Sequence, residues 1–369
     1  MKKVAFYTNM PSPYRVEFFN LLGQHCDLYV FFEMKASSSR DPKWFSDNCR
    51  SFHAVFLRGI KYSGEAAFCP GIVREFKKVR PDINVVCNMS SLSGMLLVDY
   101  FNKHKINYVV EGDGAFSKPS SKIKTKIKKR ILSNAEMLLF TSDEHKDYLL
   151  RFGGEEKRMF HYPFSSILSS QIVEKPAGDD NKKRLRNELG IKNMTTFVSV
   201  GRFIPLKDFS TLIKAFKKYD EGAQLLLIGG KPTKEYQNII STEGIKNIHF
   251  VDFQEPNKLF KYMQASDCFV FSSLCDVWGL VINEAMAVGL PVISSSGALA
   301  ARELSKNNNG VCIYQAGNIV DLQAKIDYFL SLSEEEIHLI ANQNLQKIKE
   351  YTLEEMCDRH VNLLNLSQN

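Results

Sequence analysis

The sequence predicts an α/β fold made of two doubly wound domains. One reason is length, because 369 residues exceed what a single ordinary hydrophobic core supports, so about two domains are expected. Another is the alternation of short β-rich apolar runs with helical patterns along the whole chain, which is typical of parallel sheets with right-handed crossovers. The alternation is interrupted between residues 161 and 186, where polar and turn-forming residues gather. We therefore expect the domain boundary there.

The individual elements follow from the apolar periodicity. Runs of four to seven β-branched, aromatic and aliphatic residues bounded by turn residues predict strands, and longer runs of period 3.6 predict helices. The end of the chain is almost entirely helical in pattern. Strands are expected over 4–9, 27–33, 83–88, 106–110, 137–143, 196–202, 224–230, 248–253, 267–273 and 291–296, and helices over 91–103 and near 208–219.

Composition indicates a folded protein of the cytoplasm. Hydrophobic residues make up 44% of the chain and charged residues 24%, as in globular proteins. The sequence has no run of about 18 uncharged apolar residues, so no transmembrane helix is predicted, and its start resembles a strand rather than a signal peptide. Eight cysteines are scattered with no C-x-x-C pair. This argues against a metal site or a disulfide framework and for a reducing compartment.

The positive charge is concentrated in the first half. Residues 1–170 carry 26 Lys and Arg against 17 Asp and Glu, whereas the remainder carries 22 against 24, so the first domain is expected to meet an anionic partner. The segment 118–131 has seven basic residues, with Ile123, Ile127 and Ile131 at helical spacing. This pattern predicts a helix on an anionic membrane surface. A helix that packs its isoleucines inward is the alternative, and a nucleic-acid binder is disfavoured because the run has no interleaved aromatic residues.

The stretch VGRFIPLKDF joins a predicted buried strand to the start of a helix. Gly201 permits a tight turn or a close backbone approach. Arg202 and Lys207 then lie at the carboxyl end of the strand, where ligands bind in parallel α/β sheets. Both cations suit a diphosphate. The alternative is an ordinary loop with two solvated cations.

A second stretch, CDVWGLVINEAMAVGLPVI, contains two acids around a helix start. Asp276 lies in the loop after a predicted strand, and Glu284 lies in the second turn of the helix. The free N–H groups around residues 279–281 favour a bound anion, while a carboxylate accepts bonds from neighbouring sugar hydroxyls. The stretch therefore predicts a grip on a nucleotide-sugar. Alternatively, Asp276 caps the helix and Glu284 is a surface residue.

Together these two motifs resemble family 4 of the retaining glycosyltransferases. The resemblance covers most of the chain and includes NMPSPYR, RNELGI, IHFVDFQ and NNNGVCIY. It implies that Arg202 and Lys207 neutralise the donor diphosphate and stabilise the leaving group. It also implies that Asp276 contacts hydroxyls of the donor sugar and that Glu284 holds the ribose. The residues implied to bind the donor are Gly201, Arg202, Lys207, Asp276, Gly279, Leu280, Val281 and Glu284.

Two positions depart from the family pattern. Asp276 stands where the family has Glu, one methylene longer, which puts the identity of the donor sugar in doubt. Asp252 stands where many relatives have Gly, near the edge expected to hold the base.

The resemblance implies the GT-B fold, with two Rossmann-like domains facing across a cleft. Residues 1–165 would bind the acceptor and residues 166–349 the nucleotide-sugar. Residues 350–369 would form a helix that returns to the N-terminal domain. The implied activity is a retaining transfer of the hexosyltransferase type, with no cofactor or metal. A UDP- or GDP-sugar would be the donor.

The acceptor is expected to be a lipid-linked glycan at the inner face of the plasma membrane, in surface polysaccharide biosynthesis. This expectation rests on the basic first half and on family habit. The alternatives are a GT-B sugar-nucleotide epimerase or phosphorylase, or a non-catalytic subunit that binds a nucleotide-sugar.

The N-terminal half offers fewer candidates. Tyr14 and Arg15 follow the first predicted strand and could border the acceptor or the donor phosphates. They are assigned to the acceptor, although a proline-fixed turn with a surface arginine is an equal alternative. In VVEGDGAF, Asp113 is the candidate to orient the acceptor hydroxyl, with Glu111 as the second choice. A glycine turn without a catalytic role is also consistent with this stretch.

Overall fold

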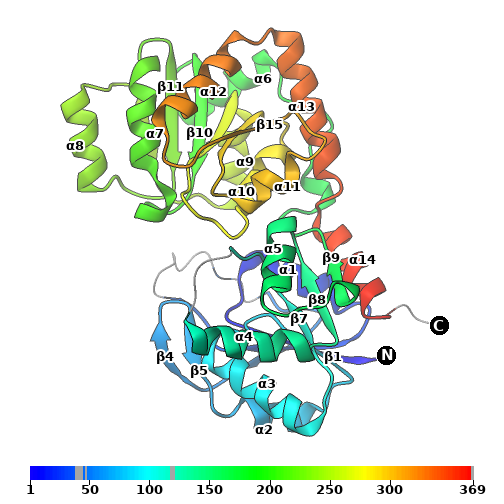
Figure 1. Ribbon diagram of the computed structural model, residues 1–369. Helices are drawn as coiled ribbons and strands as arrows, with labels where there is room; N and C mark the ends of the chain where they lie inside the picture. Colours follow the sequence, from blue (N-terminus) through cyan, green and yellow to red (C-terminus); the bar gives the residue numbers. More distant parts are fainter. Residues whose placement is uncertain (38–44, 46–47, 117–120, 367–369) are drawn as a thin grey trace. The chain divides into compact units, whose positions relative to one another are not determined.

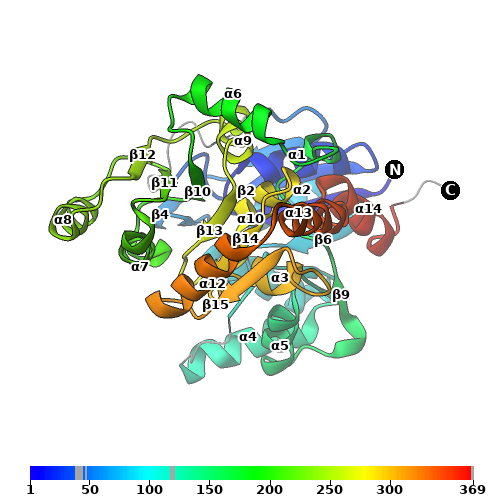
Figure 2. The ribbon, with the colours of Figure 1, turned by 90° about the horizontal axis from the view of Figure 1, so that it is seen from above.

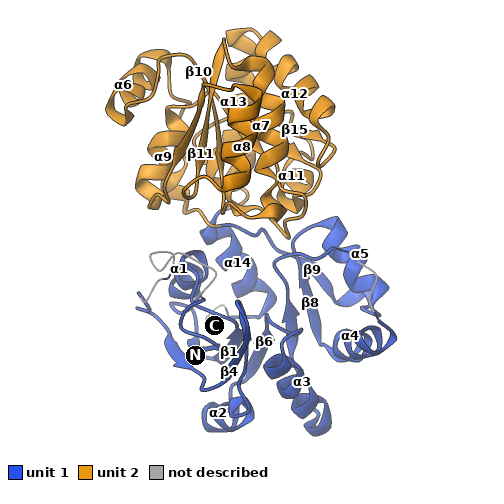
Figure 3. Ribbon diagram, turned by 90° about the vertical axis from the view of Figure 1, so that its left-hand side faces the viewer, with its two compact units in different colours: residues 1–165, 352–369 blue, residues 166–351 orange. Residues whose placement is uncertain are grey.

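The structure is a computed structural model, and it describes residues 1–37, 45, 48–116 and 121–366. The chain forms two compact units. Unit 1 comprises residues 1–165 and 352–369, and unit 2 comprises residues 166–351 (Figure 3). Each unit is built on one parallel sheet covered by helices, so the predicted fold class of two doubly wound α/β domains is confirmed.

The sheet of unit 1 has the strand order β3-β2-β1-β6-β7-β8-β9. The sequence did not predict β3, β9 or the antiparallel hairpin β4-β5, because these strands have only three or four residues each and so lack a clear apolar run. The strands are β1 (Lys3–Thr8), β2 (Asp27–Phe32), β3 (His53–Phe56), β4 (Ile60–Ser63), β5 (Ala66–Phe68), β6 (Ile83–Val86), β7 (Val109–Glu111), β8 (Met137–Phe140) and β9 (Met159–His161).

In the part of unit 1 that the structure describes, six helices surround this sheet (Figure 1). The Ser91 and Ser142 side chains cap the N-termini of α3 and α5, which satisfies backbone N–H groups that the helix leaves open. α14 contacts α1, so the end of the chain covers one helix of the N-terminal segment. The helices are α1 (Pro13–Leu22), α2 (Ile72–Val79), α3 (Leu92–His104), α4 (Lys122–Asn134), α5 (Asp143–Arg151) and α14 (Leu353–Leu363), with a 3-10 turn η2 (Glu156–Arg158).

The sheet of unit 2 has the strand order β12-β11-β10-β13-β14-β15. Its central strands β10, β11 and β13 are almost entirely buried, as expected for a parallel sheet covered on both faces. β10 pairs with β11 on one side and with β13 on the other. The strands are β10 (Thr195–Val200), β11 (Ala223–Ile228), β12 (Ile248–Val251), β13 (Cys268–Phe271), β14 (Val292–Ser295) and β15 (Val311–Tyr314).

Helices cover both faces of this sheet, with α7 and α12 on one side and α6 and α9 on the other (Figure 2). The helices are α6 (Asp179–Leu189), α7 (Phe209–Phe216), α8 (Lys234–Glu243), α9 (Pro256–Gln264), α10 (Leu280–Ala287), α11 (Leu299–Leu304), α12 (Ile319–Ser331) and α13 (Glu334–Ile348). The 3-10 turns are η3 (Ser169–Gln171), η4 (Pro205–Lys207) and η5 (Lys217–Tyr219).

The sequence did not predict α6, which falls within the stretch expected to be a linker. Its residues are mostly charged, so its apolar periodicity is weak. Ion pairs hold it instead: Lys182 and Arg186 each bind the carboxylate of Asp267, at 2.7 Å. Arg186 also donates to the main-chain oxygen of Ala265, so the RNELGI stretch anchors a helix to the start of β13.

The basic helix α4 exposes part of its isoleucine stripe. Ile131 is buried, whereas Ile123 is 74% exposed and Ile127 38%, so inward packing holds for only one of the three. Residues 118–120 of the predicted basic segment lie outside the described residues. No helix in the part of the chain that the structure describes is long and apolar enough to cross a membrane.

Candidate functional site

Two loops meet at the carboxyl edge of the unit 2 sheet, because β10 and β13 are parallel neighbours. The loop after β10 ends in the turn η4, and the loop after β13 leads to α10. Side chains of the second loop hold the backbone of the first. Ser272 Oγ donates to the Lys207 oxygen at 2.8 Å, and Ser273 Oγ donates to the Leu206 oxygen at 3.0 Å. The position of η4 therefore depends on main-chain oxygens and not on the lysine side chain.

Lys207 and Asp276, which the sequence places 69 residues apart, form a direct ion pair. Each side chain is 18% exposed, and the Lys207 ammonium lies 4.9 Å from the centre of the Phe271 ring. Arg202 lies half-buried in the same loop as Lys207. The interpretation of Lys207 as a solvated loop cation is therefore wrong.

The close backbone approach predicted at Gly201 exists, but a different glycine makes it possible. The Gly201 N–H donates to the Ile228 oxygen at 2.9 Å. A Cβ on Gly201 would be 3.5 Å from the Phe209 ring, an ordinary contact. A Cβ on Gly229, whose φ is 148°, would lie 2.0 Å from the Gly201 oxygen. Gly229 is therefore the residue at which a side chain cannot be accommodated.

The start of α10 is set by the Trp278-Gly279 pair. Gly279 is the N-cap residue and has a φ of 103°, in the left-handed region that favours glycine. Trp278 is fully buried, and its Nε1 donates to Asn283 Oδ1 at 3.0 Å. Asp276 accepts a bond from the Trp278 N–H at 3.4 Å and lies outside the cap position, so the alternative that Asp276 caps this helix is wrong.

Glu284 lies in the second turn of α10, where it is half-buried. Its Oε1 accepts a hydrogen bond from Ser166 Oγ at 3.0 Å. Burial raises the pKa of Glu284 to about 7, although the Ser166 bond acts in the opposite direction. The carboxyl is therefore poised to lose its proton near neutral pH. The alternative that Glu284 is a simple surface residue is wrong.

At the carboxyl edge of the unit 1 sheet, Arg15 forms ion pairs with both Glu111 and Asp113. Arg15 is 3% exposed, so the alternative of a surface arginine is wrong. The Tyr14 hydroxyl donates to Asp113 Oδ2 at 3.4 Å. The structure thus brings together all the N-terminal candidates, which come from the first turn of α1, the end of β7 and the loop after it.

No sequence pattern indicated His360, which lies on α14 and contacts this cluster. Its Nε2 lies 3.1 Å from Glu111 Oε2. Burial by itself raises the pKa of Glu111, but the charges of Arg15 and His360 outweigh that effect and hold the pKa at about 2. The described residues contain no group of three or more His, Cys, Asp or Glu arranged to hold a metal ion.

A comparison with protein families identifies the segment that carries the Lys207–Asp276 pair. Residues 181–346 match the family described as glycosyl transferases group 1. After the family that it matches, we call this segment the group 1 glycosyltransferase domain. It contains β10 to β15 and therefore the whole carboxyl edge of the unit 2 sheet.

Curated relatives match this chain over part of its length. An uncharacterized glycosyltransferase of Methanocaldococcus jannaschii is 27% identical over 252 residues, which cover 63% of this chain and 59% of the relative. The D-inositol 3-phosphate glycosyltransferase of Corynebacterium glutamicum is 29% identical over 192 residues, 48% of this chain and 45% of the relative. The chain thus spans about half the length of the curated relatives that it matches.

Solved structures match over nearly the whole chain. Anabaena HepE in complex with UDP and glucose has a TM-score of 0.78 and 14% identity, covering 99% of this chain and 100% of that one. WaaG, a glycosyltransferase involved in lipopolysaccharide biosynthesis, has a TM-score of 0.71 and 14% identity, covering 98% and 99%. At this identity the likeness concerns the fold, and it confirms the GT-B fold that the sequence predicts.

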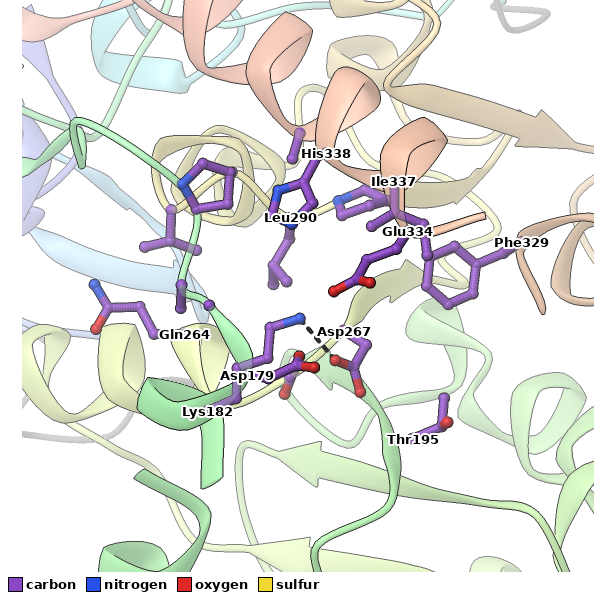
Figure 4. Close-up of a pocket in the computed structure, with 18 of the residues that line it drawn as sticks. Asp179, Lys182, Thr195, Gln264, Asp267, Leu290, Phe329, Glu334, Ile337 and His338 are labelled. Carbon is purple, nitrogen blue, oxygen red and sulfur yellow. Dashed lines mark hydrogen bonds and ion pairs between the residues drawn. The ribbon is translucent and has the colours of Figure 1, made fainter. Parts of the chain in front are cut away.

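The group 1 glycosyltransferase domain also has a cavity of about 410 Å³ at the opposite, amino-terminal edge of its sheet (Figure 4). Thr195, the first residue of β10, and Asp267, just before β13, line it. Lys182 reaches Asp267 within it, and Glu334 and His338 line it from α13. None of the predicted site residues is among its lining residues, so this cavity is separate from the candidate site.

Trp278→Phe is expected to destabilise the group 1 glycosyltransferase domain by about 1–3 kcal/mol, because it leaves the buried Asn283 oxygen without its donor. The free energy of unfolding measured in urea tests this. Replacing both partners, in Trp278→Phe with Asn283→Leu, should recover part of the loss because no orphaned acceptor remains. Equal stability of wild type and Trp278→Phe would contradict the role assigned to this hydrogen bond.

Proposed function

We propose that this protein is a retaining glycosyltransferase of the hexosyltransferase type that moves a sugar from a nucleotide-sugar to a glycan acceptor. The observation that carries the proposal is the Lys207–Asp276 pair at the carboxyl edge of a group 1 glycosyltransferase domain. The pair lies beside the start of α10, which has no side-chain cap. A cation, a carboxylate and free helix N–H groups at one edge suit a diphosphate joined to a sugar.

In this proposal the donor replaces contacts that the site residues make with one another. Lys207 leaves Asp276 for the diphosphate, together with Arg202, and the carboxylate turns to hydroxyls of the donor sugar. The main-chain N–H groups of residues 279–281 receive phosphate oxygens. Catalysis then consists of positioning the acceptor and stabilising the departing diphosphate electrostatically.

Glu284 would hold the ribose, and the close packing of Gly201 on Gly229 would keep the strand ends compact near the base. Asp252 is exposed just after β12, at the same edge, where it would face the base. A UDP-sugar is the favoured donor, because HepE, which shares the fold, is described in complex with UDP-glucose. A GDP-sugar is the other outcome that an assay should examine.

On the acceptor side, Tyr14 would border the acceptor and Asp113 would orient its hydroxyl, while Arg15, which is 3% exposed, would act on the acceptor through its ion pair with Asp113. Asp113 fits this role because its side chain is 34% exposed. Burial raises its pKa above the ordinary value, although Arg15 lowers it. A carboxylate with a raised pKa accepts a hydrogen bond from a hydroxyl more strongly than a carboxylate with a lower pKa does.

The acceptor we propose is a lipid-linked glycan at the cytoplasmic face of a membrane, in surface polysaccharide synthesis. The basic character of residues 1–170 and the exposed Ile123 and Ile127 on α4 support this. A putative teichuronic acid biosynthesis glycosyltransferase of Bacillus subtilis, 26% identical over 169 residues, points the same way.

The test is a thermal-stabilisation screen with UDP-glucose, UDP-galactose and GDP-mannose, followed by transfer of the labelled sugar to a lipid-linked extract. We expect stabilisation by at least one donor and its loss in Arg202→Ala and Glu284→Ala. Conversion of the nucleotide-sugar without an acceptor would favour an epimerase. Binding without transfer, with cellular glycan unchanged by Asp276→Asn, would favour a non-catalytic subunit. No stabilisation by any of the three donors would contradict the proposal.

Binding of UDP-glucose is expected to tighten about tenfold between pH 6 and pH 8, because the ribose hydroxyls donate to the ionised form of Glu284, whose pKa is about 7. UDP-glucose is the suitable ligand because its diphosphate does not titrate in this range. The dissociation constant measured by calorimetry at several pH values tests this, and Glu284→Gln should show a flat profile. Identical profiles for wild type and Glu284→Gln would refute the role of Glu284.

The same carboxyl affects stability in the opposite direction. The folded protein keeps this proton up to about pH 7, whereas an ordinary glutamate loses it near 4.5. The contribution of Glu284 to the free energy of unfolding is therefore largest below pH 4.5 and falls as the pH rises to 7.

A further inference from the structure

Four charged side chains of unit 1 form a linear series of contacts, His360–Glu111–Arg15–Asp113. His360 Nε2 lies 3.1 Å from Glu111 Oε2, and Arg15 binds Glu111 through one terminal nitrogen and Asp113 through the other. The exposed fractions of the four side chains, in the same order, are 0%, 0%, 4% and 34%. Asp113 is therefore the end of the series that reaches solvent.

The geometry calls for His360 in its charged form. Its Nδ1 lies 2.7 Å from the Met356 oxygen, and a carbonyl oxygen only accepts, so this nitrogen donates. Its Nε2 faces the Glu111 carboxylate and must also carry a proton to bond it. The rings of Phe18 and Tyr162, with centroids at 4.9 and 5.0 Å, cover the imidazole. The series thus holds two positive and two negative charges, which balance.

We infer that Glu111 and His360 are positioning residues that act through Arg15 to place Asp113 and set its charge. This inference rests on the proposed function, in which Asp113 orients the acceptor hydroxyl. Removing either residue would leave the buried series with an unbalanced charge. Helix α14 then belongs to the acceptor side of the site, although it is formed by the last part of the chain.

The groups that face Asp113 come from four elements. Arg15 and Tyr14 lie on α1, Glu111 ends β7, Cys87 follows β6, and Tyr162 follows β9. Burial raises the pKa values of the Cys87 thiol and the Tyr162 hydroxyl well above their ordinary values, so both are neutral near pH 7. Among the residues that the structure describes, the charges that act on Asp113 are therefore those of the series itself.

Two substitutions should move the titration of Asp113 in opposite directions. His360→Gln keeps an N–H that can donate to Glu111 but removes a positive charge, so the midpoint for Asp113 should rise. Glu111→Gln removes a negative charge, so the midpoint should fall. We expect the Asp113 midpoint to shift by at least about half a pH unit in each single variant. In the double variant, whose charges balance again, the midpoint should lie close to that of wild type. A purely structural role would give no such opposition.

The measurement is a titration of Asp113 by NMR in protein labelled with ¹³C at aspartate carboxyl groups, assigned with Asp113→Asn. His104→Gln is the matched control, because this histidine also has Nδ1 at a main-chain oxygen, 2.9 Å from Tyr100, but is exposed on α3. It should leave the midpoint unchanged. Shifts in the same direction, or none, would overturn the inference. If one single variant fails to fold, the double variant and the other single variant still show in which direction each charge shifts the Asp113 midpoint.

A second readout separates this inference from the proposed function. At saturating UDP-glucose, where the titration of Glu284 does not limit donor binding, the pH dependence of UDP release should show an acid limb that follows the Asp113 midpoints across the variants. Midpoints that move while the acid limb stays fixed would overturn the role in the reaction. A wild type that releases no UDP would count against the proposed function, while the NMR titration would still decide on the charge coupling.

Discussion

Lys207→Met is expected to lower UDP-glucose turnover by about 100- to 1,000-fold, the usual loss when one group that stabilises a developing anion is removed. The ammonium is the direct partner of Asp276 and is proposed to move to the diphosphate. The substitution should leave the fold intact, because the bonds that hold η4 go to main-chain oxygens of Leu206 and Lys207. Initial rates of UDP release, with the melting temperature measured in parallel, test this.

Lys214→Met is the matched control, because this lysine lies on α7, directly after η4, and its side chain is exposed. Its turnover should remain within about twofold of wild type, as expected of a solvated surface cation. If Lys207→Met and Lys214→Met turned over UDP-glucose at the same rate, the assignment of Lys207 to the leaving diphosphate would be wrong.

Arg15→Met is expected to reduce the free energy of unfolding by about 3–5 kcal/mol, because it removes the cation between two buried or half-buried carboxylates. Glu111 is fully buried and would keep only His360 as a charged partner. Asp113 would lose its ion pair altogether. Denaturant unfolding at pH 7 measures the effect, which should shrink at low pH, where Asp113 takes up a proton.

The control for this prediction is Arg50→Met. Arg50 pairs with Glu17, which lies on α1 like Arg15, but the Arg50 side chain is 60% exposed. Exposed pairs of this kind contribute at most about 1 kcal/mol. A similar, small loss for both variants would show that the buried pairs of Arg15 contribute no more than a surface pair does.

The sequence contains enough information for the inner strands of both parallel sheets, because buried parallel strands are continuous apolar runs, but it does not predict the edge strands β3, β9 and β15. It predicts the candidate residues of unit 2 individually, since each follows a strand at the edge where ligands bind. It does not predict α6, which consists largely of charged residues and depends on Asp267 for its position. The hairpin β4-β5 has the same difficulty, because every residue of β4 is exposed.

The apolar periodicity of the sequence does not predict which side chains, far apart along the chain, contact each other. The contact between Lys207 and Asp276 spans 69 positions and that between Glu111 and His360 spans 249. His360 in particular is a single histidine within an ordinary amphipathic helix, so its periodicity marks it as buried but identifies no partner. Likewise, Gly229 stands in a Gly-Gly pair whose importance appears only when the neighbouring strand end is placed against it.

The discontinuity of unit 1 has a consequence for how the protein is made. A ribosome releases residues 1–165 and then the whole of unit 2 before residues 352–366, which carry α14. Domains generally fold in the order of synthesis. The aromatic face of α1 therefore stays uncovered by α14 until unit 2 has been synthesised. During that interval Glu111 has no imidazolium beside it. The nascent first domain is therefore a candidate for chaperone capture, and a chain that stops at residue 351 should aggregate rather than accumulate as a folded half.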